Sequence, residues 1–266
     1  MKFFKLKSNR YLNLTVNLIN LRFNNIKYII GSKHTCNVCG HHFDSFIPWK
    51  GFVSQRVQKY NIIGSNLQNF GCYYCGSHDR LRHLILYFDK LDIWKELENK
   101  SILHIAPEEH LQDILVLKTD KYIVGDLSPD PKNKLLQKVD ITNLQFMNEY
   151  FDFIICNHVL EHVPDDIKAM KELYRVLKKG GKVILQTPYS EEMFDSYEDE
   201  SINYEKDRLA YFGQEDHVRI YGLGIFEKLK SSGFKLNIVY HNDLFIEEES
   251  YKYGLNPREN LIMISK

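Results

Sequence analysis

The sequence predicts an α/β protein with a mostly parallel sheet, preceded by a small module organised by a metal ion. From Ser101 onward, short apolar runs alternate with stretches of helical periodicity, and four of the five cysteines form two CxxC pairs ahead of that region. Alternating strands and helices are typical of βαβ units and parallel sheets. Paired CxxC motifs in a chain without an export signal indicate a metal site more often than a disulfide framework.

Composition limits the class of protein. The chain of 266 residues is 44% hydrophobic and 26% charged, as in ordinary globular proteins. Its 35 Lys and Arg residues balance 35 Asp and Glu residues, so no overall basic field would attract nucleic acid, and such a partner is not expected. No apolar run reaches the roughly 18 residues of a membrane-spanning helix, and the basic start lacks the apolar core of a signal peptide. We therefore expect a cytoplasmic protein.

The first 30 residues are expected to form a basic N-terminal arm. Residues 1–43 contain seven basic residues and no acidic ones. The stretch 11–30 fits either a strand or an amphipathic helix. A peripheral membrane contact through this arm stays open, as do contacts with substrate or partner, and the sequence does not set the oligomeric state.

Residues 31–79 are expected to form the metal-binding module. Its two CxxCG motifs supply Cys36, Cys39, Cys72 and Cys75, and each motif can present two thiolates to one tetrahedral ion. Because four thiolates leave no open position, we predict a structural Zn²⁺ in a zinc-ribbon-like module, with free or redox-active thiols as the alternative. The 32 residues between the pairs indicate an insertion. Spare ligand candidates are His34, His41, His42 and His78.

The elements after the module can be placed in chain order. Helical periodicity from Asp79 predicts a connecting helix over 80–100. Further helices are expected at 108–118, 165–181 and 224–233. Strands are expected at 101–106, 121–126, 151–156, 182–187, 234–240 and 260–265, with a short one ending at Asp140. The run FDFIIC at 151–156 is apolar on both faces, as in a sheet covered on both sides.

Residues 101–187 resemble the class I S-adenosylmethionine-dependent methyltransferases, in the type 11-like group whose fourth strand runs into VLEHV. The segments that carry the resemblance are FDFIICNHVLEHVPDD and RVLKKGGKVILQTP. The resemblance implies a Rossmann-like, seven-stranded, mostly parallel sheet over 101–266 with a closing hairpin and flanking helices. It also implies an acceptor-binding insertion around 188–223.

A narrower resemblance concerns a subgroup in which CxxCG, an arginine and LHIAPE follow one another, here 72–76, Arg80 and 103–108. Members similar to it are associated with surface-glycan pathways. In this subgroup LHIAPE stands where the wider family has a glycine-rich loop. Glycines let the backbone approach the cofactor closely, and Pro107 removes an amide donor.

The resemblance implies a site for S-adenosylmethionine at the carboxyl ends of the strands. Asp126 ends the second strand, where a carboxylate accepts hydrogen bonds from the ribose hydroxyls. Asp140 and Ile141 stand where the family contacts adenine, and Asn157 stands near the methionine moiety. The remaining candidates for cofactor contact are His104, Ala106, Glu108, Leu127 and His158. The alternative for Asp126 is an ordinary solvated turn residue, and the alternative for Asp140 is a helix-capping or turn residue.

The segment 212–222 is expected to cover the acceptor. It concentrates three candidates for acceptor binding, Asp216, Arg219 and Tyr221, around His217. A hydroxyl acceptor must lose its proton near neutral pH, a task that suits histidine. We predict that His217 is the general base or orients the acceptor, and that His162 supports the site.

The run from His158 to His162 also spells HxxEH, the inverted zinc-protease signature. A protease needs this motif inside a continuous helix, together with a third ligand from elsewhere. Here it directly follows a buried strand, and Pro164 interrupts any helix, so the protease interpretation is disfavoured.

The function predicted from sequence is methyl transfer to a small hydroxylated acceptor, such as a sugar or a surface-glycan precursor. Two alternatives stay open. One is an RNA methyltransferase that grips RNA with the module and the basic arm. The other is a non-catalytic scaffold that has lost cofactor binding, which the missing glycines would explain.

Overall fold

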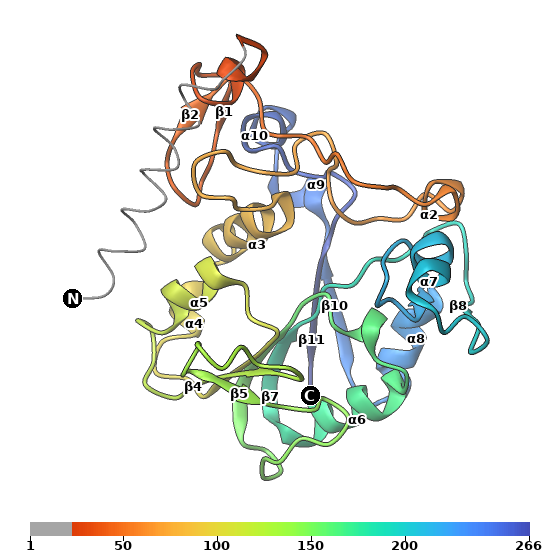
Figure 1. Ribbon diagram of the computed structural model, residues 1–266. Coiled ribbons are helices and arrows are strands. Elements are labelled where there is room, and N and C mark those ends of the chain that lie inside the picture. Colours follow the sequence, from red (N-terminus) through yellow and green to blue (C-terminus); the bar gives the residue numbers. More distant parts are fainter. Residues whose placement is uncertain (1–22) are drawn as a thin grey trace.

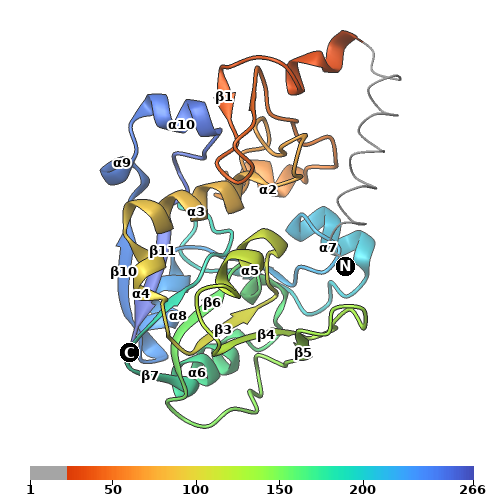
Figure 2. The ribbon, with the colours of Figure 1, turned by 90° about the vertical axis from the view of Figure 1, so that its left-hand side faces the viewer.

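The computed structural model describes residues 23–266; most of the expected basic arm, residues 1–22, lies outside the described residues. A seven-stranded sheet with helices on both faces forms the larger part of the molecule (Figure 1). In both views the cysteine-containing module lies above helix α3 (Asp79–Lys90), with the sheet below it (Figures 1 and 2). In the part of the chain described, no helix is long and apolar enough to cross a membrane.

The sheet has the strand order β10-β11-β7-β6-β3-β4-β5. The strands β5, β4, β3, β6 and β7 pair in parallel, while β11 pairs antiparallel with both β7 and β10. The prediction of a mostly parallel, Rossmann-like sheet with a closing hairpin is therefore confirmed. The strands are β3 (Ile102–Ile105), β4 (Tyr122–Asp126), β5 (Leu136–Lys138), β6 (Phe151–Cys156), β7 (Leu177–Ile184), β10 (Lys235–Val239) and β11 (Leu261–Ser265).

The direction of strand addition reverses between β3 and β6. The chain adds β4 and β5 on one side of β3, then crosses over to place β6 and β7 on the other side. The carboxyl ends of the two strands diverge at such a switch point, and ligands of open α/β sheets bind in the crevice that results. The topology alone thus selects the ends of β3 and β6 as the ligand-binding edge.

Both faces of the sheet are covered by a core. On β6, Ile154 and Cys156 belong to one apolar cluster, while Phe153 and Ile155 belong to the cluster on the opposite face. This two-sided burial explains why the strand reads as a continuous apolar run. The first cluster takes residues from α6 (Asp166–Val176) and α8 (Gly224–Ser231), and the second from α3, α4 (Ile93–Glu96) and α5 (Glu109–Leu115).

The helix predicted over 165–181 is too long. The structure ends α6 at Val176, and Leu177 already pairs with Phe151 at the start of β7. Gly180 and Gly181, which were expected to end the helix, lie instead within β7. The strand register shifts there, and Gly180 has φ of 74°. Strand pairing of β7 with its neighbour β6 overrides the helical propensity of the lysines.

The connecting helix predicted over 80–100 is broken. Asp92 has φ of 55°, so α3 ends at Lys90 and α4 begins anew at Ile93. The short strand expected to end at Asp140 ends at Lys138. A left-handed residue cannot continue a right-handed helix, and this accounts for the first difference.

The module packs against the C-terminal part of the chain. Its hairpin, β1 (His34–Thr35) and β2 (His42–Phe43), lies against α10 (Glu247–Tyr253), which follows α9 (His241–Leu244). Arg82 on α3 is fully buried; it donates hydrogen bonds to the carbonyls of Ser77 (2.8 Å) and Tyr253 (3.2 Å), and its guanidinium lies 3.8 Å from the Phe46 ring centroid. One buried cation thus ties the module to the sheet domain.

The segment between the two CxxC motifs extends away from the module along the domain. Ile63 exchanges backbone hydrogen bonds with Tyr189 (2.8 and 3.3 Å). The segment's helix α2 (Gln55–Lys59) contacts α7 (Glu205–Phe212), which belongs to the 188–223 insertion (Figure 1). The insertion also contains the short pair β8 (Tyr197–Glu198) and β9 (Arg219–Ile220). Two segments far apart in sequence therefore meet beside the ligand-binding edge.

Candidate functional site

Two strained residues mark the switch-point crevice. Ala106 directly follows β3 and has φ of 48°. Asn157 and then His158 follow β6, and His158 has φ of 53°. Backbone hydrogen bonds hold both in place, from Ala106 to Gly125 (2.8 Å) and from His158 to Gln186 (2.7 Å). Left-handed conformations of non-glycine residues cost about 1–2 kcal/mol and concentrate at functional sites. Ala106 therefore adopts the turn that a glycine would provide in a glycine-rich loop.

The first loop contains a closed hydrogen-bond network. His104 is fully buried; its Nε2 lies 2.8 Å from Glu108 Oε2, and its Nδ1 lies 2.7 Å from the Tyr122 hydroxyl. Asn157 donates to the other oxygen of Glu108 (3.2 Å) and accepts from the Gln186 amide (3.2 Å). Burial would raise the pKa of Glu108, but the hydrogen bonds from His104 and Asn157 outweigh it and lower the pKa. The network links the ends of β3 and β6 and fixes the floor of the crevice.

The predicted ribose and adenine residues follow along the same edge. Asp126 ends β4, and its Oδ1 accepts a hydrogen bond from the Ser128 amide (2.7 Å), while Leu127 beside it is exposed. Asp140 is exposed, and its Oδ1 accepts from the Thr142 amide and hydroxyl, which lowers the pKa of the carboxyl. Ile141 packs in the core. The structure thus places two carboxylates beyond the ends of neighbouring strands.

A cavity of about 780 Å³ adjoins the crevice. Ligand pockets typically measure about 300–1,000 Å³. One wall comes from the segment between the CxxC motifs and includes Trp49, Phe52 and Phe70, and another wall includes Asp216 and His217. From the sequence, the segment that forms the first wall was recognised only as an insertion, although its aromatic side chains could have indicated a ligand-binding surface.

Arg80 is a further residue that the sequence-based prediction of the site did not include. It lines the large cavity and also a cavity of about 10 Å³, roughly the space of one water molecule. Glu108, Asn157 and His158 line the smaller cavity. Arg80 therefore stands between the crevice and the large cavity. The signal in the sequence was its fixed place after the second CxxCG motif.

His162 and His217 lie together, as the sequence suggested. The Val218 amide donates to the Glu161 carbonyl (2.9 Å) and so holds the 212–222 segment against the short 3₁₀ turn Leu160–His162. The two imidazole rings meet edge to face at 4.6 Å, and His162 Nδ1 lies 3.2 Å from Asp216 Oδ2. Burial lowers the pKa of His217 to about 4, so its ring is neutral near pH 7. A neutral imidazole can accept a proton or bind a cation.

Glu161 is buried beside the two histidines. Its Oε2 accepts a hydrogen bond from the Thr187 hydroxyl (3.0 Å), and its Oε1 lies 3.5 Å from His158 Nδ1. Burial would raise the pKa of Glu161, but the contact with His158 and the nearby imidazoles lower it to about 2. The Glu161–His162–His217 cluster thus combines one carboxylate and two imidazoles at the wall of the large cavity.

Arg219 and Tyr221 correct the sequence prediction of acceptor contacts. Tyr221 is fully buried and donates to Asp166 (2.9 Å), and the Arg219 guanidinium donates to the carbonyls of Leu160 (3.0 Å), Val163 and Pro164 (2.8 Å). Arg219 touches the cavity wall, but its polar atoms face the protein. Both residues hold the LEHVP segment in position; of the three candidates, only Asp216 is exposed to the cavity.

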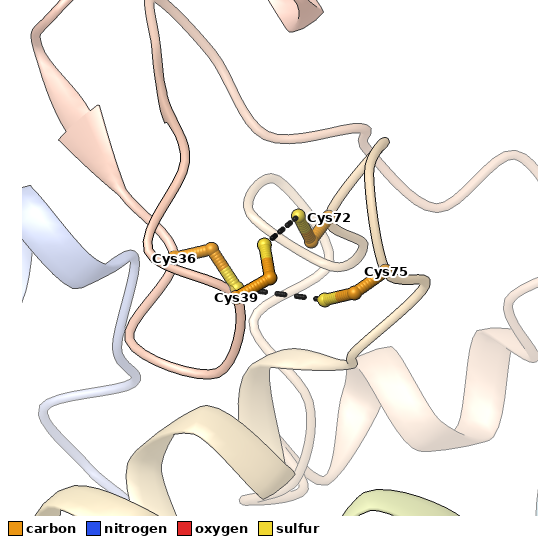
Figure 3. A group of neighbouring side chains, drawn as sticks. All are labelled: Cys36, Cys39, Cys72 and Cys75. Carbon is orange, nitrogen blue, oxygen red and sulfur yellow. Dashed lines mark hydrogen bonds between the residues drawn. The ribbon is translucent and has the colours of Figure 1, made fainter. Parts of the chain in front are cut away.

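The four paired cysteines converge in the module (Figure 3). Cys36 Sγ lies 3.7 Å from Cys75 Sγ, and Cys39 Sγ lies 3.8 Å from Cys72 Sγ. A tetrahedral ion with metal–sulfur distances of about 2.3 Å places its ligands about 3.8 Å apart. The thiols therefore fit such an ion, whereas the spare histidine candidates are not part of the cluster.

The two CxxCG turns have the same backbone geometry. The amide of Gly40 donates to the Cys36 carbonyl (2.7 Å) and that of Gly76 to the Cys72 carbonyl (2.9 Å). Gly40 and Gly76 have φ of 75° and 72°. Glycine adopts this conformation without strain. It lets each turn direct both of its thiols to the same point.

Part of the chain is similar to known methyltransferases. Residues 109–185 match the family model described as a methyltransferase domain. A tRNA U34 carboxymethyltransferase of Campylobacter fetus subsp. fetus is 36% identical over 94 residues, which cover 35% of this chain and 30% of that protein. A demethylmenaquinone methyltransferase of Leptospira interrogans is 28% identical over 148 residues, covering 54% of this chain and 55% of that protein.

Among solved structures, the chain is similar to an S-adenosylmethionine-dependent methyltransferase from Mesorhizobium loti. The TM-score is 0.45 at 12% identity, with 66% of this chain and 97% of that one covered. The chain spans less than two-thirds of the length of the curated relatives it matches. Over part of its length, the chain is therefore similar to a methyltransferase domain and to curated methyltransferases.

Proposed function

We propose that this protein transfers a methyl group from S-adenosylmethionine to a small hydroxylated acceptor bound in the large cavity. The observation that carries the proposal is the position of this cavity. It adjoins the switch-point crevice at Arg80, and its wall includes Glu161 and His217. A donor in the crevice and an acceptor in the cavity would meet at that junction.

The cofactor is proposed to lie along the carboxyl ends of β4, β3 and β6. Asp126 would accept hydrogen bonds from the ribose hydroxyls, and Asp140 would accept from the adenine amine. The methionine part would pass Ala106 and reach Asn157 and His158. Leu127, Ile141, His104 and Glu108 would shape the crevice. The left-handed turn at Ala106 supports this arrangement against the scaffold alternative, because the loop keeps the conformation that glycine would confer.

Methyl transfer from a sulfonium requires little covalent chemistry from the protein. The acceptor oxygen bonds to the methyl carbon while the sulfur–carbon bond breaks, and the electron pair remains on sulfur as S-adenosylhomocysteine forms. The hydroxyl proton leaves to a base, a role that we assign to His217, with His162 in support. Holding the two reactants in line supplies most of the acceleration.

The chemical class of the acceptor is inferred from the lining of the cavity. The lining includes aromatic rings such as Trp49 and Phe70 and polar groups such as Glu161 and Asp216. A sugar or surface-glycan precursor offers both apolar C–H faces and hydroxyls, and so fits such a lining. The expected surface-glycan role remains part of this proposal.

RNA methylation is the second candidate function. Relatives that match over part of the chain are named tRNA U34 carboxymethyltransferases. Trp49 and Phe52 at the cavity are 44% and 57% exposed, and exposed aromatic side chains can stack on unpaired bases. The balanced charge of the chain favours the small acceptor.

The module is proposed to hold one structural Zn²⁺ on Cys36, Cys39, Cys72 and Cys75. The sulfur–sulfur distances and the matched glycine turns support this. A thiolate-bound zinc persists in a reducing compartment, in keeping with the expected cytoplasmic location.

Methyl-labelled S-adenosylmethionine tests the proposed function. The full-length protein is incubated with the labelled donor and, in separate reactions, with a fraction of sugars and glycan precursors, with total tRNA, or with extracted quinones. We expect label in the sugar fraction, independent of salt between 50 and 200 mM. Salt-sensitive labelling of tRNA would select the second candidate, since RNA binding weakens as salt rises. No labelling of any fraction, with no binding of the donor, would select the scaffold.

A further inference from the structure

The Glu161–His162–His217 cluster has the composition of a metal site outside the cysteine module. One ligand atom from each residue can be chosen so that all three lie within 4.8 Å of one another. Glu161 and His162 come from the 3₁₀ turn after β6, and His217 comes from the insertion, held there by the Val218–Glu161 backbone bond. Glu161 and His217 are buried and border the large cavity.

The free nitrogen of His217 points to a missing ligand. His217 Nε2 is buried and has no hydrogen-bond partner among the described residues, while the ring is hydrogen-bonded to the Phe212 carbonyl. A buried polar atom without a partner costs free energy, so such atoms are rare in folded proteins. A cation at this position would satisfy Nε2.

His162 is arranged in the same way. Its Nδ1 faces Asp216 Oδ2 at 3.2 Å, which leaves Nε2 for another partner. Histidines that bind metals usually donate their other ring N–H to a carboxylate or a backbone carbonyl, which fixes the ring. His162 has the carboxylate and His217 has the carbonyl. Glu161 is oriented in turn by the Thr187 hydroxyl.

We propose that Glu161, His162 and His217 bind one divalent transition-metal cation at the wall of the large cavity. Two imidazoles and one carboxylate suit Zn²⁺, Mn²⁺ or Fe²⁺, whereas Mg²⁺ and Ca²⁺ prefer oxygen ligands. Ligands of a cation at about 2.1 Å lie about 3 to 3.5 Å apart, so the side chains close inward on binding. Three protein ligands leave open positions toward the cavity.

The catalytic consequence rests on the proposed function, whereas cation binding does not. An acceptor hydroxyl that occupied an open position would lose its proton to solvent more readily, since a bound cation lowers the pKa of coordinated oxygen. His217 would then act as a ligand and not as the base, because the coordinated hydroxyl would lose its proton to solvent. The inverted HxxEH motif contributes two of its residues to this site, but outside the continuous helix of a protease.

Titration of the full-length protein with Mn²⁺ and, separately, with Zn²⁺ tests the site in the absence of S-adenosylmethionine. The cysteine-bound metal is left in place, and the metal content of each sample is measured before titration. We expect one further Mn²⁺ or Zn²⁺ per chain and no binding of Mg²⁺. His217→Ala and His162→Ala should each weaken this binding at least tenfold.

Glu215→Gln serves as the matched control, because Glu215 is exposed in the same segment and lies outside the cluster. It should bind the cation like the wild-type protein. His162 is partly exposed, so His162→Ala keeps the test valid if His217→Ala does not fold. Absence of a further cation in the wild-type protein, or wild-type affinity for the cation in both histidine variants, would overturn the proposal. Full methyl transfer with the cluster emptied by a chelator would overturn the catalytic role alone and leave the proposed function standing.

Discussion

At the scale of one residue, Ala106 adopts the left-handed turn that a glycine would provide in the loop after β3. Its φ of 48° is the conformation that glycine adopts freely, and its amide is fixed by the carbonyl of Gly125 on β4. The side chain is the smallest that can replace glycine, and so the strain stays low enough for the fold to impose the turn.

Ala106→Gly should therefore stabilise the protein or leave it unchanged. Relief of about 1–2 kcal/mol of left-handed strain is partly offset by about 0.4–1 kcal/mol from the more flexible unfolded chain. We expect Tm to rise by up to about 3 °C, measured by thermal melting. Ala106→Val should have the opposite effect and lower Tm, since a β-branched residue fits this conformation poorly. A fall in Tm for Ala106→Gly would show that the loop is not strained.

The positions of candidate site residues were predictable from sequence where these residues lie at the ends of strands. Asp126 and Asn157 lie at strand ends whose location the apolar runs had fixed. The direction of a side chain in an irregular segment was not predictable. Tyr221 was expected to face the acceptor but is buried against Asp166, because only the folded insertion decides which side of the segment faces the interior.

At the scale of elements, the two CxxCG turns are the clearest sequence signal for a local structure. Each requires only five residues and one glycine at positive φ, so spacing alone predicts the shared geometry. The end of helix α6, by contrast, could not be predicted from a local pattern. Its end depends on pairing between Leu177 and Phe151, a contact that no local pattern encodes.

Cys36→Ser should remove or weaken the proposed zinc and destabilise the module. Cys36 is fully buried in an apolar cluster with Phe43, Phe46 and Cys72, so a module without the ion has little else to hold it. We expect the zinc content to fall from about one per chain and Tm to fall by several degrees. Metal analysis and thermal melting measure both.

Cys156→Ser is the control for this prediction. Cys156 is also fully buried, but it lies on β6 outside the cluster, so the variant should keep its metal. A wild-type protein that contains no zinc, or that loses it with unchanged Tm, would contradict the structural role.

At the scale of the whole molecule, the module and the sheet domain build the site together. The segment between the CxxC motifs supplies one wall of the large cavity, and Arg82 and the Ile63–Tyr189 pairing fix that wall to the domain. The α/β class and the positions of most strands along the chain could be predicted from alternating apolar runs. The cavity could not, because it forms between segments more than 100 residues apart and depends on long-range packing.

The central claim is that the switch-point crevice binds S-adenosylmethionine against Asp126. Calorimetric titration of the full-length protein with S-adenosylmethionine tests it most directly, comparing the wild type, Asp126→Ala and Asp130→Ala. Asp130 is a suitable control because it is exposed in the same loop and accepts the same kind of local amide bond, from Lys132 (2.9 Å). Each charge-assisted hydrogen bond to the ribose is worth about 1.5–3 kcal/mol. We expect one site in the wild type, a Kd raised about tenfold or more in Asp126→Ala, and wild-type binding in Asp130→Ala. Absence of binding in the wild type, or an unchanged Kd in Asp126→Ala, would contradict this claim.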